Sequence, residues 1–575
     1  MSESLHPTAS HHLLEGCNAL GIDYLFCNLG TDHAPIIEEM ARWQRENRRL
    51  PKVILCPHEN TAVHMAAGYA VATGRGQAVL VHVDAGTANA AMGLHNLFRA
   101  RIPVLLMAGK APFSTYGELH GGRQSFVHFV QEPYDQGSVV RPYVKWEYTL
   151  PAAELTREVL ARGYTMMQSD PPGPAYLMLP REVLAARAPE VPAVRRRSIE
   201  ARPLRAGPAV AADVERIADG LLAAIEPLLI TGYAGRNPAV PPLLEELAQL
   251  AGVRVCEFNP LYVNMPRSSP CFGGSQPGPF AERTDFGIVL DSDVPWVPSA
   301  FQGNPDAYWV QIDVDALKRD MPMWSFPTDL RMQADAETVL RQLIEVVRAR
   351  QTPEQANAAA ARVEIMAQER AKRRAAAETL AAQPGEDGAI AVPFLCAALA
   401  RALHPDDIVV NETITNASVV DEHLPRERPG TKVCTLAGGL GFSGGVALGQ
   451  KLAHPERTVV QIVGDGSFYF CNPSSVYAVA GQYGLPIFTV ILDNSGWGAV
   501  KASTLRMYPK GEAHDTDQFA SLLAPDMDFG KIAEAAGAHG EVVSDPAAVN
   551  VAIARCLAAV RSGRSAVLHV RVSPL

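Results

Sequence analysis

The sequence predicts an α/β protein of three domains, each built on a largely parallel sheet flanked by helices. Short apolar runs that suit buried parallel strands alternate with helix-like stretches along the chain. The 575 residues are enough for three or four domains of ordinary size. Two stretches without a sustained apolar period interrupt this pattern, and they favour three domains.

These two stretches mark the expected domain boundaries. Residues 186–210 are rich in Pro, Arg and Ala. Residues 348–387 are dominated by Ala, Arg, Glu and Gln, which is typical of a solvated helical connector. We therefore expect an N-terminal domain over residues 1–186, a central domain over 205–347 and a C-terminal domain over 388–575. Strands of the central domain are expected at residues 227–231, 253–258, 286–290 and 308–312.

Composition and charge argue against a nucleic-acid partner and against a membrane protein. The formal net charge is -10, whereas nucleic-acid binders normally carry basic patches. No apolar run is long enough to span a bilayer, and the first residues lack the features of a signal peptide, so a cytoplasmic protein is expected. The nine cysteines form no Cys-x-x-Cys pair, and we interpret them as small core residues.

The most informative stretch lies near the carboxyl end. Apolar runs at residues 458–463 and 486–492 suit parallel strands, and residues 472–483 between them suit a crossover helix. Both strands would end at the same edge of the sheet, where ligands of open α/β sheets bind. Asp465 and Asn494, which follow these strands, are therefore expected to be neighbours although 29 positions separate them.

The turns after these strands carry the residues of a site for a divalent metal and a diphosphate. Mg²⁺ prefers oxygen ligands, which Asp465, Asn494 and the main-chain carbonyl of Gly496 would supply. Glycines let the backbone approach a phosphate, and amides entering a helix favour negative charge. The expected diphosphate contacts are Gly464, Gly466 and Ser467. Either motif alone is more often a simple turn, but their matched positions favour the site.

The pattern Gly464-Asp465-Gly466, followed by 26 residues and then Asp493-Asn494, resembles the signature of thiamine diphosphate-dependent enzymes of the acetolactate synthase, benzoylformate decarboxylase and pyruvate decarboxylase type. The usual pair is Asn-Asn, and Asp493 replaces the first. The resemblance covers nearly the whole chain. It implies thiamine diphosphate and Mg²⁺ as cofactors, with two cofactor-binding domains around a central Rossmann-like domain. It also implies a homodimer or homotetramer, because family members assemble the site from two chains.

The N-terminal domain is expected to supply the residue that activates the cofactor. Residues 56–60, CPHEN, and the small-residue helix after them resemble the family segment whose Glu meets N1′ of the aminopyrimidine; Glu59 occupies that place. Sharing a proton with N1′ promotes the tautomer that deprotonates thiazolium C2. Without the resemblance, a Glu at this position would be a favourable helix-dipole partner. The small residues predict that the helix packs closely on its sheet.

Two further C-terminal segments resemble cofactor-binding stretches of the family. In residues 435–449, TLAGGLGFSGGVALG, Leu440 takes the place of the apolar residue that props the bent cofactor, and the Gly438 carbonyl would accept from its amino group. In residues 411–416, NETITN, Thr415 would donate to the diphosphate.

The same glycine cluster satisfies a dinucleotide motif. Gly439, Gly441 and Gly444 match G-x-G-x-x-G, which alone would indicate a nicotinamide or flavin dinucleotide. That interpretation needs an acidic residue after the next strand to hold a ribose. Asp465 stands there and is better explained by the metal, so an NAD-dependent oxidoreductase is a lower alternative.

Residues around the entrance would select the reaction. Residues 28–37, NLGTDHAPII, resemble a loop of the benzoylformate decarboxylase branch, with Thr31 against the substrate carboxylate and Asp32 as a second polar contact. His82 matches the first catalytic histidine of that branch, and its usual pKa suits a proton carrier; otherwise it is a strand-end histidine bonded to a carbonyl. The second histidine would align near residues 293–298, which contain none.

Other positions resemble the acetolactate synthase branch or line the pocket. Gln131 matches a glutamine of that branch that reaches the thiazolium side. Trp497 and Val500 begin the helix that lines the substrate site in relatives, although this spacing is as typical of core residues.

The predicted activity is thiamine diphosphate- and Mg²⁺-dependent cleavage or formation of a carbon–carbon bond next to a carbonyl. The leading candidate is 2-keto acid decarboxylation and carboligation of the acetolactate synthase type, with a small 2-keto acid or acyl donor as substrate. A 2-hydroxyacyl-CoA lyase is the alternative, although no carboxyl-terminal lid is evident. A non-catalytic cofactor-binding protein ranks lower, because diphosphate binding alone does not require Glu59. The flavin-contacting segment of acetolactate synthases is absent.

Overall fold

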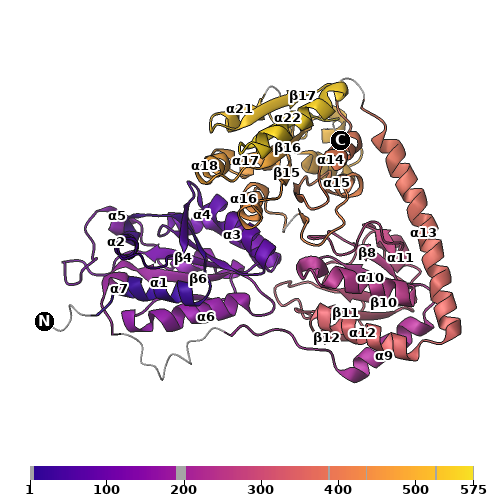
Figure 1. Cartoon of the computed structure of the whole chain (residues 1–575), viewed down its shortest axis with the longest axis horizontal. Helices are drawn as coiled ribbons and strands as arrows, with labels where there is room; N and C mark the ends of the chain where they lie inside the picture. The colour runs from indigo at the N-terminus through magenta and orange to yellow at the C-terminus, as the bar shows by residue number, and fades with distance from the viewer. Residues whose placement is uncertain (1–5, 190–201, 386–388, 435–436, 525–526, 574–575) are drawn as a thin grey trace.

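The computed structural model describes residues 6–189, 202–385, 389–434, 437–524 and 527–573. It contains three six-stranded sheets, one after another along the chain (Figure 1). Every strand pairing in them is parallel. The predicted α/β fold class is therefore confirmed. Residues 190–201 of the first expected linker, and Thr435 and Leu436 of the expected cofactor loop, lie outside the described residues.

The first sheet has the strand order β2-β1-β3-β4-β6-β5. Its strands are β1 (Tyr24–Asn28), β2 (Lys52–Leu55), β3 (Gln77–Val81), β4 (Val104–Lys110), β5 (Glu147–Thr149) and β6 (Ala175–Pro180). Its helices are α1 (Ala9–Ala19), α2 (Ala34–Arg45), α3 (Glu59–Thr73), α4 (Ala85–Arg99), α5 (Val127–Val130), α6 (Thr156–Gln168) and α7 (Arg181–Ala185). Helices α1, α2, α6 and α7 bury one face, whereas α3 and α4 bury the other. Coverage on both faces explains why β3, β4 and β6 are almost continuously apolar.

The second sheet has the order β12-β11-β10-β7-β8-β9, which is the order of a dinucleotide-binding Rossmann sheet. Its strands are β7 (Pro227–Thr231), β8 (Arg254–Glu257), β9 (Phe272–Gly274), β10 (Phe286–Leu290), β11 (Tyr308–Asp313) and β12 (Leu330–Gln333). Its helices are α9 (Ala211–Ala223), α10 (Val240–Ala251), α11 (Gly278–Ala281) and α12 (Ala336–Arg350). The four strands expected here are present, with bounds that differ by one residue at most.

A single long helix, α13 (Pro353–Ala381), joins the second sheet to the third and runs along the outside of the molecule (Figure 1). Thr352 caps it through a hydrogen bond to the Gln355 amide, and Pro353 occupies its first turn, where a missing N–H costs nothing. Only Ala359 and Met366 are buried along its 29 residues. The expected solvated helical connector is thus observed.

The third sheet repeats the order of the first, as β14-β13-β15-β16-β18-β17. Its strands are β13 (Ile408–Glu412), β14 (Lys432–Cys434), β15 (Val459–Gly464), β16 (Phe488–Asp493), β17 (His539–Val543) and β18 (Ala566–Arg571). Its helices are α14 (Val392–Ala402), α15 (Ala417–His423), α16 (Ser443–Ala453), α17 (Asp465–Phe470), α18 (Pro473–Tyr483), α19 (Gly498–Met507), α20 (Glu512–Thr516), α21 (Phe529–Glu534) and α22 (Val549–Arg561). Helix α18 is the expected crossover helix.

Helices α3 and α16 pack side by side and join the N-terminal and C-terminal domains (Figure 1). Added Cβ atoms at Gly68 and Gly449 would lie only 2.2 Å from the Val446 carbonyl oxygen and 2.1 Å from the Met65 carbonyl oxygen. The small residues of α3 therefore serve a helix–helix contact as well as the expected contact with the sheet. The same contact explains Gly445 of α16, where an added Cβ would lie 2.6 Å from the His64 Cβ atom.

All nine cysteines are buried, as expected for core residues. None of the helices in the described part of the chain combines the length and apolar character that a bilayer-spanning helix needs.

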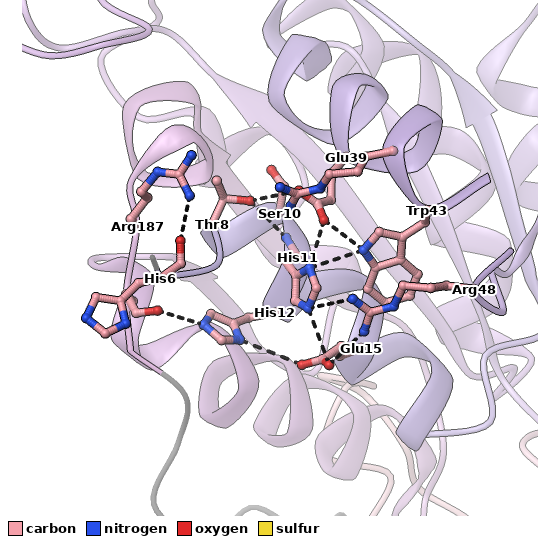
Figure 2. A network of polar contacts seen from close by, with 12 residues as sticks. His6, Thr8, Ser10, His11, His12, Glu15, Glu39, Trp43, Arg48 and Arg187 are labelled. Atoms are coloured by element: carbon pink, nitrogen blue, oxygen red, sulfur yellow. Dashed lines mark hydrogen bonds and ion pairs between the residues drawn. The ribbon is translucent and has the colours of Figure 1, made fainter. Parts of the chain in front are cut away.

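A polar network ties α1 to α2 (Figure 2). His11 Nδ1 lies 2.8 Å from Glu39 Oε1, and Trp43 Nε1 donates to the same oxygen at 2.7 Å. On the other side of His11, Glu15 pairs with Arg48 at 3.1 Å and with Arg157. A hydrogen bond from His12 and the pairing with Arg157 lower the pKa of Glu15 to about 2.

The lowered pKa of Glu15 makes the stability of the N-terminal domain depend on pH. Because the pKa is below the unfolded value, the stabilisation is present above about pH 4.5 and is lost as the pH falls toward 2. Glu15→Gln should lower Tm by about 2 °C at pH 7, and this difference should shrink as the pH falls from 5 to 3. Thermal denaturation monitored by circular dichroism measures it. Glu38→Gln, at an exposed position of α2, is the control; a Glu15→Gln difference that stays constant over this range would contradict the assignment.

Candidate active site

The predicted site residues lie in two groups at corresponding places in two sheets of the same topology. In the first sheet the strand order reverses between β1 and β3, and in the third between β13 and β15. Such a switch point opens a crevice at the carboxyl ends of the strands, where ligands bind. Thr31, Glu59 and His82 lie at the carboxyl ends of β1, β2 and β3; Thr415 and Asp465 follow β13 and β15.

Glu59 is buried at the start of α3, with 6% of its surface exposed. His58 caps this helix by accepting a hydrogen bond from the Asn60 amide at 3.1 Å. Two neutral side chains hold the Glu59 carboxylate: Asn28 donates to Oε1 at 3.0 Å and Asn89 donates to Oε2 at 3.1 Å. Because no cation in the described part of the chain pairs with it, the carboxylate is suited to share a proton with a ligand nitrogen.

His82 follows β3 and is held by Asp32. Their Nδ1 and Oδ1 atoms are 2.5 Å apart, and the Val83 amide donates to Asp32 Oδ2 at 3.1 Å. The hydrogen bond with Asp32 raises the pKa of His82. Burial alone would raise the pKa of Asp32, but the hydrogen bond with His82 and the charges of His33 and His82 together lower it. Both effects favour a charged imidazolium–carboxylate pair.

The sequence predicts Asp32 as a second polar contact of the substrate, and the structure shows its side chain engaged within the protein. It is buried, with 3% of its surface exposed, and both of its oxygens are engaged by the protein. An added Cβ at Gly109 would lie 1.4 Å from Asp32 Oδ2, and one at Gly30 would lie 1.9 Å from His82 Nδ1. The two glycines thus provide the space for the pair. We assign Asp32 the role of positioning His82.

The free side of His82 faces a small pocket lined by Thr31, Lys110, His128 and Gln131. His82 Nε2 lies 3.2 Å from Gln131 Oε1, so these two predicted residues are in contact. His128 is a second histidine in this pocket, and it comes from the N-terminal domain rather than from residues 293–298. Burial and the charge of Arg181 lower the pKa of His128. Nothing in the local sequence around His128 distinguishes it from a loop histidine.

Residues 293–298 have a different role. Asp293 accepts hydrogen bonds from both terminal nitrogens of Arg101, at 3.0 and 2.7 Å, and from Lys318 Nζ at 2.8 Å. Lys318 is fully buried and also contacts Tyr233 at 2.9 Å. These contacts attach the N-terminal domain, which contains Arg101, to the central domain.

The second group gathers oxygen atoms around Asp465. One terminal atom of the Asn494 amide lies 2.9 Å from the Gly496 carbonyl oxygen and 3.2 Å from Asp465 Oδ1. The oxygen and nitrogen of an amide are interchangeable by position. If this atom is the amide nitrogen, Asn494 donates one hydrogen bond to each of the two oxygens. If it is the amide oxygen, the oxygens of Asn494, Asp465 and Gly496 converge as they do around a cation. Asp465 Oδ2 is buried and accepts no hydrogen bond from the described residues.

Asp493, which replaces the usual Asn, is neutralised by the adjacent strand β18. His569 Nε2 lies 2.7 Å and Arg571 Nη1 2.6 Å from Asp493 Oδ2, while the Ser495 amide donates to Oδ1 at 2.8 Å. Burial alone would raise the pKa of Asp493, but His569 and Arg571 lower it. Burial and the charge of Asp493 raise the pKa of Asp465. Asp465 has no basic partner among the described residues, and a bound cation would offset its charge.

The loop before α16 is fixed by Glu412. This buried carboxylate accepts hydrogen bonds from the amides of Gly441 at 2.5 Å and Ser443 at 2.9 Å, and burial raises its pKa to about 7. Gly438, at φ +88°, and half-buried Leu440 lie in this loop. Sequence reasoning gave Glu412 no role, although it lies within the segment that contains Thr415.

The remaining predicted residues lie around Asp465. Ser467 is buried in the first turn of α17, and Thr415 is half-buried. The Trp497 ring packs against Gly466, where an added Cβ would approach it to 2.5 Å. Trp497 also meets Phe470 edge-on, with ring centroids 5.7 Å apart. Val500 is 49% exposed on α19. Trp497 thus supports the glycine turn, and Val500 is open to a ligand or partner.

Comparisons with known proteins agree with this arrangement. Residues 7–139 match the family described as thiamine pyrophosphate enzyme, N-terminal TPP binding domain, and residues 414–570 match its C-terminal TPP binding domain. Together the matches cover about half of the chain and contain both groups of site residues.

Individual relatives are similar over most of their length. The chain is 27% identical to benzoylformate decarboxylase of Pseudomonas aeruginosa, covering 84% of this chain and 85% of that protein. It is 26% identical to the acetolactate synthase isozyme 3 large subunit of Escherichia coli, covering 90% of this chain and 88% of that protein. Among solved structures, the thiamine diphosphate-dependent 4-hydroxybenzoylformate decarboxylase of Rhodococcus jostii superposes with a TM-score of 0.78 at 22% identity, covering 99% of this chain and 100% of that one. The chain therefore belongs to the thiamine pyrophosphate enzyme family.

Proposed function

We propose that this protein is a Mg²⁺-dependent 2-keto acid decarboxylase in which His82, held by Asp32, delivers the proton that completes the reaction. The observation that carries the proposal is the buried His82–Asp32 pair, with His82 Nε2 directed into a pocket beside Thr31 and Lys110. A raised pKa keeps His82 protonated, which suits a general acid. Thr31 and Lys110 offer a hydroxyl and a cation to a substrate carboxylate.

The residues around Asp465 fit the cofactor and its metal. Separations of 2.9 and 3.2 Å between oxygens are close to the edge of an octahedron with bonds of about 2.1 Å, as Mg²⁺ forms. Asp465, Asn494 and the Gly496 carbonyl would hold the metal. The diphosphate would lie against Thr415, Gly464, Gly466 and Ser467, and the aminopyrimidine against Glu59, Gly438 and Leu440. When bound, thiamine diphosphate supplies a carbon nucleophile and an electron sink.

The chain's own residues would act on the proton and the carboxylate. Glu59 would share a proton with a bound aminopyrimidine, since its two partners are neutral amides. Loss of CO₂ breaks the bond between the carboxyl and carbonyl carbons. The carbonyl carbon then takes a proton from His82 Nε2 and leaves as an aldehyde, while Asp32 stabilises the histidine.

We also propose that a second copy of the chain completes the site. In the described residues Glu59 hydrogen-bonds only within its own domain. Large apolar side chains are exposed on segments that carry site residues: Phe126, Phe129 and Val130 at α5, which contains His128, and Phe470, Val500 and Met507 on α17 and α19. Both surfaces would be covered if the group around Glu59 in one chain met the group around Asp465 in a second chain.

Carboligation of the acetolactate synthase type is the second candidate. The observation that favours it is the contact of Gln131, which matches an acetolactate synthase glutamine, with the His82 nitrogen that would otherwise donate the proton. A second carbonyl substrate would then take the place of the proton.

Product analysis tests the proposed function. The protein loaded with thiamine diphosphate and Mg²⁺ should release CO₂ and aldehyde from at least one member of a panel of aromatic and aliphatic 2-keto acids. Acyloin as the main product would favour carboligation. No product from any 2-keto acid, with cleavage of a 2-hydroxyacyl-CoA, would overturn the proposal in favour of the lyase.

Glu59→Gln should lower kcat with the preferred substrate by on the order of 100-fold or more, because the amide cannot share the proton. Glu46→Gln, at an exposed position of the same domain, should leave kcat unchanged. Full turnover by the Glu59→Gln variant would remove Glu59 from the mechanism.

Asp32→Asn should change the pH dependence of turnover. Asp32 raises the pKa of His82, so the activity of the native protein falls as the pH rises through that raised value. Without the carboxylate, the fall should begin at a lower pH, and kcat at pH 7 should drop at least about tenfold. A kcat–pH profile measures both effects. Asp23→Asn, which removes a carboxylate paired with Arg49 and Arg75 at the surface, is the control; identical profiles for Asp32→Asn and the native protein would exclude the positioning role.

A further inference from the structure

A pocket of about 340 Å³ lies away from both groups of site residues, where α13 passes the central and C-terminal domains. It is lined by residues of α13, of α14 and α15, and of the loop around β9. Its size is at the lower end of the range for small-molecule sites. Five arginines line it: Arg267, Arg370, Arg373, Arg374 and Arg401. Such a concentration is unusual in a protein whose formal net charge is -10.

The arginines are arranged around Phe272. The guanidinium carbon of Arg267 lies 4.4 Å from the centroid of this ring, and that of Arg373 lies 6.0 Å from it. Arg373 donates to the Phe272 carbonyl oxygen at 2.6 Å, and Arg370 donates to the Arg267 carbonyl oxygen at 3.4 Å. These contacts hold the guanidinium groups in place without neutralising their charge.

Several of these charges have no internal counterpart. Arg370, Arg373 and Arg401 form no ion pair with any described carboxylate, and burial lowers the pKa of Arg373. Arg267 pairs with Glu257 at 2.7 Å, but its Nη1 atom is buried without a hydrogen-bond partner, as is Nε of Arg370. An unpartnered buried donor costs free energy that a ligand acceptor would recover.

Acidic residues also line the pocket, but most are already engaged. Glu378 pairs with Arg374 at 2.9 Å, and Asp421 pairs with Lys432 at 2.6 Å. Glu427 accepts from the Ser268 amide at 3.0 Å and from its hydroxyl at 2.9 Å. Glu422 is exposed. Three arginines without an ion pair therefore face two acids without one, Glu422 and Glu427.

We propose that this pocket is a binding site for a small, multiply charged anion, an organic phosphate or a polycarboxylate. Guanidinium groups suit both because their paired donors match the oxygens of phosphates and carboxylates. Arg267 and Arg373 already lie against the Phe272 ring, so recognition rests on charge rather than on stacking. The bound anion would bridge α13 to the C-terminal domain. The proposal is independent of the function proposed for the catalytic site.

Isothermal titration calorimetry on the protein loaded with thiamine diphosphate and Mg²⁺ tests the proposal, since its diphosphate site is then filled. The probes are inorganic phosphate, fructose 1,6-bisphosphate and tricarballylate, with sorbitol as the uncharged control. At least one anion should bind saturably with a stoichiometry near one per chain. Phosphate and carboxylate probes identify which of the two anion classes the pocket prefers.

Variants locate the binding. Arg370→Gln/Arg373→Gln should weaken the best probe at least about tenfold. Arg216→Gln/Arg348→Gln makes the same charge change at exposed positions of α9 and α12 and should alter Kd less than about twofold. If the first variant does not fold, the exposed Arg401→Gln provides the same test with a smaller expected loss. No saturable binding of any anion at 10 mM, or equal weakening by both double variants, would overturn the proposal.

Discussion

The close packing of α3 against α16 is the contact on which the catalytic arrangement depends. Helix α3 begins with Glu59, and α16 follows the loop that contains Gly438 and Leu440. The two helices approach so closely at Gly68 and Gly449 that any larger side chain would meet main-chain atoms. Their relative position is therefore fixed within one chain, so the Glu59 group and the Asp465 group are presented to a second copy of the chain in one arrangement. Asn60 and Asn96 reinforce this contact by donating to the carbonyls of Gly441 at 3.0 Å and Gly439 at 2.9 Å.

The two groups of site residues differ in their electrostatics, which suits the two ends of one cofactor. Around Glu59 the partners are neutral amides, so a proton can move there without a fixed counter-ion. Asp465 has no basic partner among the described residues, whereas Asp493 remains ionised because His569 and Arg571 compensate it from β18. Asp493 stands where the family usually has Asn, and Arg571 on the neighbouring strand compensates the added charge. This compensation involves none of the three atoms proposed to hold the metal.

Sequence reasoning could predict features that depend on local patterns. The parallel strands and the turns after β15 and β16 follow from apolar runs and from Gly-Asp-Gly and Asp-Asn-Ser-Gly. Contacts between remote segments could not be predicted. The pairing of Asp32 with His82 depends on the absence of a side chain at Gly109, and His128 reaches the pocket from α5, a helix of four residues that is too short to show an apolar period. The partners of Asp493 come from a strand whose sequence reads as ordinary apolar core.

The central claim is that residues of the two sheets act as one site, completed by a second copy of the chain. Glu59→Gln and Asp465→Ala chains, each inactive alone, can be co-expressed with different affinity tags and the mixed oligomer isolated. If the site is shared between chains, each mixed dimer has one site with both native groups and one with neither. The account predicts about half of the native activity per mixed dimer. Activity no higher than that of the two parent variants would contradict it.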